Sequence, residues 1–467
     1  MEEGAGACRG MLRQILGSLG EPEGGGNLRI DGSQSWPSRY PVSDLACASI
    51  GAAALMLAAW RDPSGHGAVR LDRALASRWF GYSLRPIGWV LPKVRSVLTG
   101  DYRTRDGWIR IHANAPHHEQ RALRVLALSE RADHGAVADR VRNWKATELE
   151  EAMVQASACA AALRSPDAWR RHPQGIAVAA EPLVAWEADA AGAVGPLDVR
   201  DRKRPLAGVR VLDLTRVLAG PVATRFLAAY GATVLRLDPP TWSEPGMVPE
   251  VTVGKYCAGL DLKQPEGRAR FAALLSEADV LVHGYRPGAL QALGLGAHER
   301  ATLRPGLVDV SLDAWGWTGP WRGRRGFDSL VQMSTGIACP DGAQASPDPM
   351  PVQALDQATG YLMAACALRG LMVRREQRCG SQWRLSLART AWLLSESASA
   401  GRGAALAPMR ARDFSREIET THWGPARRLR APTRVGSLGW KWGRAACDLR
   451  SDPPSWPRMD VELSRAD

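Results

Sequence analysis

The chain has 467 residues, which is too long for one compact core and indicates two or three domains. Its hydrophobic content of 45% is ordinary for a globular protein, and no run of about 18 apolar residues is present to span a bilayer. The formal net charge of +12 would suit a nucleic-acid binder, but the arginines are interleaved with Asp and Glu and form no basic block. We therefore expect neither nucleic acid nor a membrane as a partner.

The eight cysteines are scattered without CxxC or Cys/His ligand spacing, so they indicate neither a zinc site nor a disulfide framework. Residues 1–26 are acidic and glycine-rich and lack the basic start and apolar core of a secretory signal. We expect a cytoplasmic protein with no metal and no permanently bound cofactor.

Residues 1–40 are rich in Gly, Ser and Pro and predict an irregular N-terminal segment. The run DLACASIGAAALMLAAW over 44–60 predicts a buried helix, because its apolar residues cover most of its faces. Asp44 lies near the start of this helix. A second helix is expected over 71–79.

The next stretch predicts a small mixed unit. Asp106-Gly107 predicts a turn, and residues 108–111 a strand. Helical patterns follow over 119–130, 135–143 and 147–163. We assign residues 41–186 to one region and the polar residues 187–204 to a linker.

A strand–helix–strand unit opens the second half. Val209 to Leu214 has the composition of a buried strand, Gly220-Pro221 opens a helix, and residues 233–237 form the second strand. Such a unit crosses over right-handed and forms a parallel sheet. No GxGxxG follows the first strand, so ordinary dinucleotide binding is not supported, although the helix N-terminus suits some anionic ligand.

The parallel sheet is predicted to continue to about residue 400. Residues 315–326 (WGWTGPWRGRRG) predict an irregular loop, and the Arg, Pro and Trp-rich residues 401–467 a covering segment. The remaining expected elements are strands at 260–262, 278–283, 307–312 and 383–387, a helix after Pro265, and a buried helix over 351–371 that carries Asp356 near its N-terminus.

Residues 205 to about 395 resemble the class III CoA transferases, which include formyl-CoA transferase, carnitine CoA-transferase and α-methylacyl-CoA racemase. The motifs that carry this resemblance occur in the same order as in that family. They are Leu218-Ala219-Gly220-Pro221, Gly254-Lys255, Tyr285-Arg286-Pro287-Gly288, Thr318-Gly319-Pro320, Gly326-Phe327-Asp328, Val331-Gln332, Asp356 and Ser386-Leu387.

The resemblance implies an α/β protein with a Rossmann-like parallel-sheet large domain at 205–400 and a smaller α+β domain. The small domain normally follows the large one, but here the similar region precedes it. We interpret the chain as a permuted or fused version, in which 41–186 is a truncated first copy. Whether Asp44 is equivalent to Asp356 stays open, because aligning Pro41-Val42 with Pro351-Val352 leaves one residue too many. Family members form interlocked dimers, so the protein could be a homodimer or a monomer that resembles one.

The family's chemistry implies roles for single residues. Asp356 matches the aspartate that attacks an acyl-CoA thioester, and the first turn of a helix suits an ionised carboxylate. Without the family context, an N-cap role would be the more common reading. The implied reaction moves CoA from an acyl-CoA to a carboxylic acid.

Coenzyme A brings phosphates, which call for Arg or Lys near backbone amides. Arg286 is our first candidate, followed by Arg216 and Lys255, although each could be a solvated surface cation. Ala219 and Gly220 would let a ligand approach the backbone closely, and close helix packing explains them as well.

Two other functions stay open. A racemase acting at the α-carbon of an acyl-CoA needs two acid/base groups, and Phe327 stands where similar racemases carry a His. Asp328 is expected to cap the helix that follows it, and a catalytic role for His117-His118 is weighed against surface polarity. A CoA-binding paralogue without turnover is the third reading, because the small-domain region has no glycine-rich loop and Leu218 replaces a polar residue of some transferases.

Overall fold

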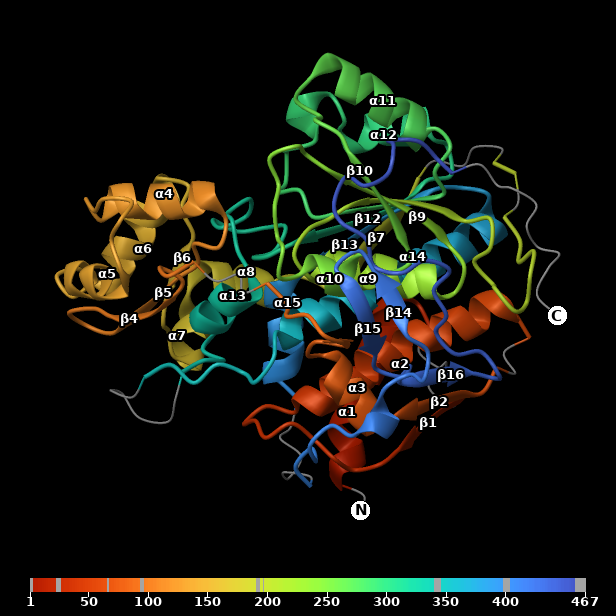
Figure 1. Ribbon diagram of the computed structural model, residues 1–467, viewed down its shortest axis with the longest axis horizontal. Coiled ribbons are helices and arrows are strands. Elements are labelled where there is room, and N and C mark those ends of the chain that lie inside the picture. The colour runs from red at the N-terminus through yellow and green to blue at the C-terminus, as the bar shows by residue number, and fades with distance from the viewer. Residues whose placement is uncertain are drawn as a thin grey trace.

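We analysed a computed structural model of the chain, which describes residues 3–21, 27–64, 67–92, 96–189, 194–195, 197–339, 346–397 and 404–457. Most of the chain forms one body of packed sheets and helices, and a small domain projects from one side of it (Figure 1). The sequence predicts this arrangement, in which a smaller α+β domain precedes an α/β large domain in the chain.

The centre of the body is a seven-stranded sheet in the order β10-β9-β8-β11-β12-β13-β7. All neighbouring strands are parallel except β7, which is antiparallel to β13. The strands are β7 (Ala185–Ala188), β8 (Arg210–Leu214), β9 (Thr233–Asp238), β10 (Lys255–Gly259), β11 (Val280–His283), β12 (Val308–Asp313) and β13 (Ser381–Ser386).

Both faces of this sheet are covered. Val211 and Val234 pack with the helices α9 (Ala219–Ala229) and α14 (Ala354–Gln377), whereas Leu212 belongs to a second core with α11 (Pro265–Leu275). Side chains alternate between the faces of a strand, so burial on both faces explains why these strands are continuously apolar. The β8–α9–β9 unit lies where the sequence predicts it.

Two expectations for this domain need correction. The strand expected over 260–262 is wrong: β10 ends at Gly259, and the backbone N–H of Leu260 donates to the Asp238 carbonyl where the chain turns away. The expected linker 187–204 overlaps β7, which closes the edge of the sheet. The Ala and Trp residues of β7 are as compatible with a linker as with an edge strand, so only pairing with β13 defines it.

The small domain consists of a three-stranded antiparallel sheet and three helices with their own hydrophobic core. Its elements are β4 (Gly100–Arg103), β5 (Trp108–Ile111), β6 (Ala160–Ala162), α4 (Pro116–Val125), α5 (His134–Val141) and α6 (Ala146–Gln155). The single helix expected over 147–163 is wrong in its second half. Ser157 adopts a left-handed φ of 58°, and the alanines after it pair with β5.

The N-terminal region is more regular than predicted. Residues 1–40 contain α1 (Glu3–Ser18) and β1 (Leu28–Asp31), so the irregular segment is wrong there. Glycines in α1 make its helical pattern hard to see in the sequence. Its apolar face, formed by Met11, Ile15 and their neighbours, packs on α2 (Val42–Arg61). Residues 71–79 divide into β2 (Val69–Asp72) and α3 (Arg73–Trp79).

The helix α2 corresponds to the buried helix predicted over 44–60 and packs against α14. Contrary to the expectation that no segment could span a bilayer, α2 has the length and hydropathy of a membrane-spanning helix. However, 94% of its most apolar window is buried inside the protein. Protein contacts therefore account for its apolar character.

The C-terminal covering segment contains strands that complete sheets of the first half. β16 (Thr433–Val435) joins β1 and β2 in one three-stranded sheet, and β15 (Gly424–Arg428) joins β14 (Glu419–Thr421) and β3 (Leu84–Pro86) in another. In the opposite direction, β7 from the first half closes the large sheet. The two halves of the chain thus exchange strands.

Short helices connect these parts (Figure 1). They are α7 (Pro166–Arg171), α8 (Pro173–Ala180), α10 (Val248–Val251), α12 (Ala297–Leu303), α13 (Asp328–Thr335), α15 (Leu387–Ser395), η2 (Gln291–Leu293) and η3 (Ala411–Asp413). The small domain contacts the body through α13, which packs against β5 and β6.

Candidate functional site

Asp356 is the third residue of α14, one turn before the point where this helix crosses α9. The crossing is close: a Cβ on Gly360 would lie 2.3 Å from the Ala219 carbonyl oxygen. Residues four apart lie on the same helix face, so Asp356 is on the face of α14 that meets the first turn of α9. Its side chain is 7% exposed.

The N-terminus of α14 is capped by Asp328, the first residue of α13. One carboxylate oxygen of Asp328 accepts hydrogen bonds from the backbone N–H groups of Leu355 and Asp356, at 2.9 and 3.0 Å. The Gln332 amide donates to the other oxygen. The expectation that Asp328 caps the next helix is therefore wrong, since it caps α14, which a sequence pattern cannot reveal.

The two carboxyl groups have different protonation. Burial raises the pKa of Asp328 to about 6, a rise that its backbone hydrogen bonds limit. Burial, together with the charge of Asp328, raises the pKa of Asp356 well above its usual range. No described Arg or Lys side chain pairs with Asp356. Of the two carboxyl groups, Asp356 therefore binds a proton more readily, and Asp328 ionises more readily.

The loop between β8 and α9 is strained at Val217, which has a φ of 65°. A β-branched residue rarely adopts this conformation, and such strain persists only where the surroundings enforce it. The Val217 N–H donates to Glu244 at 2.8 Å, and Glu244 in turn pairs with the buried Arg236. This arrangement fixes the turn that presents Arg216.

Arg216 lies between two aromatic rings at the carboxyl ends of β8 and β11. Its guanidinium carbon is 4.8 Å from the Trp242 ring centroid and 5.8 Å from that of Tyr285. Arg286 follows one residue after Tyr285, is exposed, and donates to the Gly323 carbonyl at 3.1 Å. The structure thus brings these two predicted cations to the same edge of the sheet.

Lys255 does not lie at a ligand surface, so its predicted role in phosphate binding is wrong. Its side chain is fully buried, with Nζ 2.9 Å from an Asp213 oxygen and 3.0 Å from the Pro221 carbonyl. Lys255 thereby joins β10 and β8 to the first turn of α9.

Ala219 and Gly220 are also explained by packing. A Cβ on Gly220 would lie 2.2 Å from the Thr215 side chain, so only glycine allows α9 to start this close to β8. Ala219 is 3% exposed and belongs to the hydrophobic core. Of the two explanations that the sequence permits, the geometry favours helix packing.

Two further arginines, which the sequence analysis does not name as candidates, reach this region. Arg121 comes from α4 of the small domain, and Arg325 from the Gly and Trp-rich loop before α13. Burial lowers the pKa of Arg325, and the charges of Arg286 and Arg121 lower it further. Lowering by like charges indicates that these groups lie close together.

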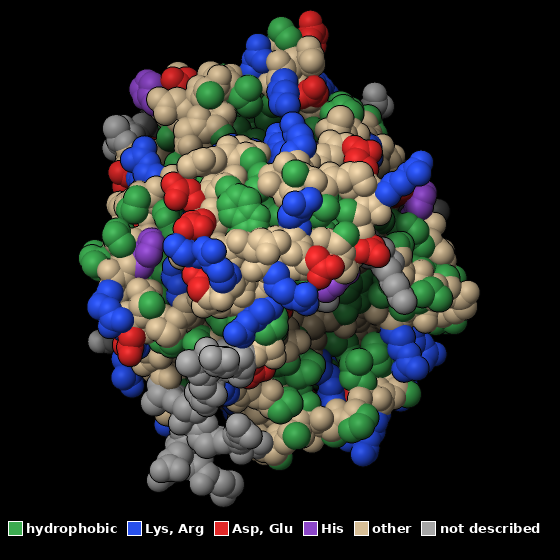
Figure 2. All heavy atoms as spheres, turned by 90° about the vertical axis from the view of Figure 1, so that its left-hand side faces the viewer, with side chains coloured by type: hydrophobic (Ala, Val, Ile, Leu, Met, Phe, Trp, Pro, Cys, Tyr) green, Lys and Arg blue, Asp and Glu red, His purple; other side chains and the backbone are tan. Residues whose placement is uncertain are grey.

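We call Arg121, Arg216, Arg286 and Arg325 the junction arginines. Among the described residues, none of the four forms an ion pair with a carboxylate. A cavity of about 340 Å³ opens beside Arg121 and is lined by Arg121, Arg124, Ala156 and Ser157. Figure 2 views the side that carries the small domain and shows Lys and Arg side chains spread over it among Asp and Glu.

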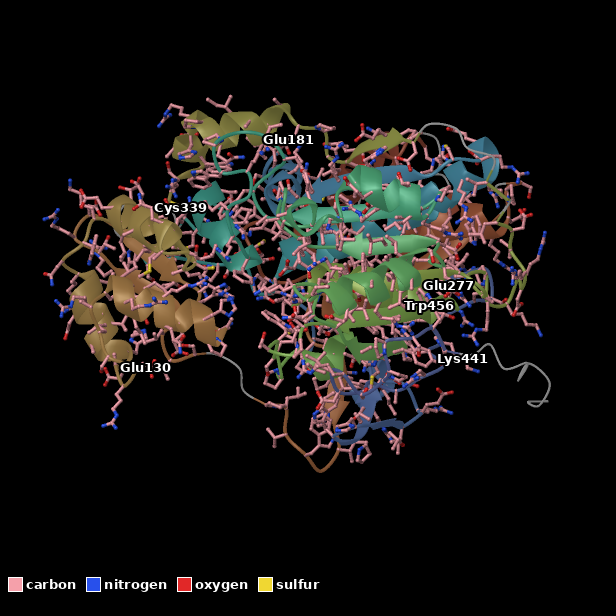
Figure 3. The ribbon with its side chains drawn as sticks, turned by 90° about the horizontal axis from the view of Figure 1, so that it is seen from above. Glu130, Glu181, Glu277, Cys339, Lys441 and Trp456 are labelled. Carbon is pink, nitrogen blue, oxygen red and sulfur yellow. The ribbon has the colours of Figure 1, made fainter. Side chains whose placement is uncertain are left out.

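Two histidines of the small domain lie where that domain contacts the segment before α13. His112 stacks on Phe327 with ring centroids 3.8 Å apart, and His118 meets that ring edge-on at 5.9 Å. Burial and the nearby His117, His112, Arg325 and Arg121 lower the pKa of His118 to about 3, so its ring is neutral. Its Nδ1 atom is buried without a hydrogen-bond partner in the described structure. Figure 3 shows this domain, marked by Glu130, beside the sheet body, marked by Glu277.

The described residues contain no group of three or more His, Cys, Asp or Glu side chains placed to hold a metal ion. The arrangement instead offers one buried carboxyl group at a helix start and a cationic surface for anions nearby. A buried nucleophile and a polyanion-binding surface are what acyl transfer from a phosphate-bearing thioester requires.

Comparison with known proteins supports this interpretation. Residues 206–435 match the sequence profile of CoA-transferase family III. This part of the chain, which includes Asp356 and the strand–helix–strand unit, is therefore similar to that family. Residues before 206, including the small domain, lie outside the match.

Among individual relatives, an acyl-CoA transferase of Gibberella moniliformis is 29% identical over 59% of this chain and 52% of its own length. The probable fatty acyl-CoA transferase Rv3272 of Mycobacterium tuberculosis is 33% identical over 37% of this chain and 47% of its own. A succinyl-CoA–D-citramalate CoA-transferase of Chloroflexus aurantiacus is 34% identical over 38% and 46%. A crystal structure of Rv3272 superposes with a TM-score of 0.37, at 29% identity over 40% of this chain and 56% of that one. The chain thus spans about half the length of the curated relatives it matches.

Proposed function

We propose that the protein transfers CoA from an acyl-CoA thioester to a carboxylic acid through a covalent intermediate on Asp356. The observation that supports this proposal is that a buried carboxyl group and a set of arginines both lack a partner of opposite charge. Asp356 has no cationic partner, and the junction arginines have no carboxylate partner within the described structure. A CoA thioester matches both, since it combines an electrophilic carbonyl with several phosphates.

The proposed reaction runs in two symmetrical halves. A carboxylate oxygen of Asp356 attacks the thioester carbonyl carbon, the C–S bond breaks, and CoA leaves as the thiolate. The thiolate then attacks the aspartyl carbonyl of the resulting mixed anhydride, which releases the donor acid as its carboxylate. The acceptor carboxylate attacks the carbonyl carbon of the aspartyl thioester, the C–S bond breaks, and CoA leaves again as the thiolate from a second mixed anhydride. The thiolate then attacks the acceptor carbonyl of that anhydride, which forms the new CoA thioester and releases the Asp356 carboxylate.

Asp356 must lose its proton before it attacks. Because burial and the charge of Asp328 raise the pKa of Asp356, this ionisation is less favourable than that of an exposed aspartate. A carboxylate with a raised pKa is more basic and therefore the stronger nucleophile once it has ionised. Positioning by Asp328, which fixes the first turn of α14 through two backbone N–H groups, aims this group without competing for the substrate.

Intact-protein mass spectrometry tests the proposal. The full chain is mixed with a panel of acyl-CoAs and then with hydroxylamine, which converts an aspartyl thioester or anhydride to a hydroxamate. We expect a hydroxamate on the peptide that carries Asp356 and none in Asp356→Ala. If CoA binds but no acyl-CoA gives a hydroxamate on that peptide, the protein is not a transferase that uses this mechanism.

One observation favours a second candidate, an isomerase acting at the α-carbon of an acyl-CoA. Phe327 cannot move a proton, but the structure stacks His112 on its ring and places the neutral His118 beside it. A histidine and Asp356 could then serve as the two acid/base groups. Uptake of deuterium at the substrate α-carbon from heavy water, with no transfer of CoA to an added acid, would identify this activity.

A further inference from the structure

The chain contains two copies of one strand–helix–strand–helix arrangement. β1, α2, β2 and α3 form the first, and β12, α14, β13 and α15 form the second. In each copy the two strands are parallel neighbours, and a long buried helix connects them in space. The registers agree. Ile30 pairs with Leu71 just before α3 begins, and Leu312 pairs with Leu385 just before α15 begins.

The strand on the other side of β2 and of β13 strengthens the correspondence. β16 lies antiparallel to β2, and β7 lies antiparallel to β13. Each copy therefore receives its third strand from the other half of the chain. The two units share topology, register and strand exchange, although α13 lies between β12 and α14 in the second unit. Positions in the paired strands and at the helix starts can therefore be matched.

The entries to the two long helices fix this matching. The Val42 N–H donates to the Tyr40 carbonyl at 2.8 Å, and the Ala354 N–H donates to the Val352 carbonyl at 2.8 Å. The residues between them, Pro41 and Gln353, have φ/ψ angles of −75°/60° and −77°/68°. Each helix starts at the next residue, so Asp44 and Asp356 are both third residues.

The surroundings of the two aspartates differ at the position that Arg73 occupies beside Asp44. Arg73 forms a two-pronged ion pair with Asp44, with Nη1–Oδ1 and Nη2–Oδ2 distances of 2.9 and 3.0 Å. Arg73 is the first residue of α3, after Arg70-Leu71-Asp72. The first residue of α15, after Arg384-Leu385-Ser386, is Leu387. An apolar side chain thus takes the place of the arginine in the second copy.

We infer that Asp44 is the counterpart of Asp356 and that its ion pair with Arg73 prevents it from acting as a nucleophile, so that the chain has one reactive aspartate. Both Asp44 oxygens are engaged, and attack on a thioester would leave the buried guanidinium uncompensated. The sheet around Asp44 has three strands, whereas the one beside Asp356 has seven. This inference rests on the proposed function only where it concerns reactivity.

A thermal-unfolding cycle tests the ion pair without any substrate. We expect Asp44→Asn and Arg73→Leu each to lower Tm by several degrees, and the double variant to recover much of that loss, because both partners of a buried pair are then removed. The exposed pair of Arg29 and Asp31 serves as the matched control, and Asp31→Asn should change Tm by less than about 1 °C. Additive losses in the Asp44 and Arg73 variants would overturn the inference.

The hydroxylamine experiment tests the number of reactive groups. Wild type should carry at most one hydroxamate per chain, on the Asp356 peptide, and Asp44→Asn should retain it at the same level. A hydroxamate on the Asp44 peptide of the wild-type protein would overturn the inference. If no peptide is marked, the proposed transferase mechanism fails, and the thermal cycle alone decides the role of Arg73.

Discussion

At the scale of single residues, the ionisation of Asp356 depends on the carboxylate beside it. Asp328 caps α14 and also contributes a negative charge that raises the pKa of Asp356. Asparagine at position 328 keeps an acceptor oxygen for the two N–H groups and removes the charge. The two contributions of this residue can therefore be separated.

We expect Asp328→Asn to shift the rising limb of kcat/KM against pH toward lower pH, because Asp356 then ionises more easily. The measurement is the pH–rate profile with one acyl-CoA donor. Asp328→Ala, which also removes the cap, should in addition lower the free energy of unfolding by about 1 kcal/mol. An unshifted profile in the Asn variant would show that the charge of Asp328 does not act on Asp356.

The raised pKa of Asp356 also predicts how stability depends on pH. An aspartate whose pKa is higher in the folded state than its unfolded value of about 3.9 favours folding when protonated, and this contribution is lost as pH rises through the folded pKa. We therefore expect Asp356→Asn to gain in Tm over wild type as pH rises from about 4 to 8. Thermal unfolding at a series of pH values measures the difference. A Tm difference that stays constant over this range would contradict the raised pKa.

At the scale of elements, the position of Asp356 depends on how closely α14 crosses α9. Gly360 allows this approach, and Ala219 and Val222 are its neighbours. In an exposed helix, Gly→Ala stabilises by about 1 kcal/mol. At this crossing the added methyl must push the helices apart.

We accordingly expect Gly360→Ala to destabilise the protein by about 1–3 kcal/mol and to lower activity, because the first turn of α14 moves away from α9. Gly10→Ala in α1, where nothing lies within 4 Å of the added carbon, is the matched control and should be neutral or stabilising. Chemical denaturation of both variants checks the contrast. Equal effects would mean that packing at the crossing is not tight.

The elements were predictable where the pattern was local. Continuous apolar strands, the strand–helix–strand unit and the two long buried helices all follow from periodicity and length. Elements that depend on a distant partner were missed, as with β7, β16 and the alanines of β6, because their composition is equally compatible with a loop or a helix. Position 255 was misjudged for a similar reason: only the fold shows that the lysine pairs with Asp213 in the interior.

At the scale of the whole molecule, the candidate site is shared by both halves of the chain. The family motifs supply Asp356, Arg216 and Arg286, whereas Arg121 comes from the small domain. A pair of adjacent arginines in the Gly and Trp-rich loop was the one local signal for Arg325. Nothing near position 121 in the sequence indicates that it lies beside Arg325, since the contact arises from the docking of the small domain.

Arg121→Ala and Arg325→Ala should each raise the KM for acyl-CoA by about tenfold or more with a smaller change in kcat, because they remove contacts to charged groups. The effect should shrink as salt is added. Arg140→Ala, an exposed arginine on α5 of the same domain, is the control and should leave KM unchanged. A change in kcat alone would place these arginines outside substrate binding.

The exchange of strands between the halves has a consequence for biosynthesis. When the first half leaves the ribosome, the free edge of β2 cannot be covered, because β16 begins only at Thr433. At a synthesis rate of about 10 residues per second, the edge of β2 stays uncovered for roughly half a minute until β16 is made. An uncovered strand edge is a template for pairing with other chains. The nascent protein is thus vulnerable to aggregation until β16 is made, and chaperones that shield strand edges would act in that interval.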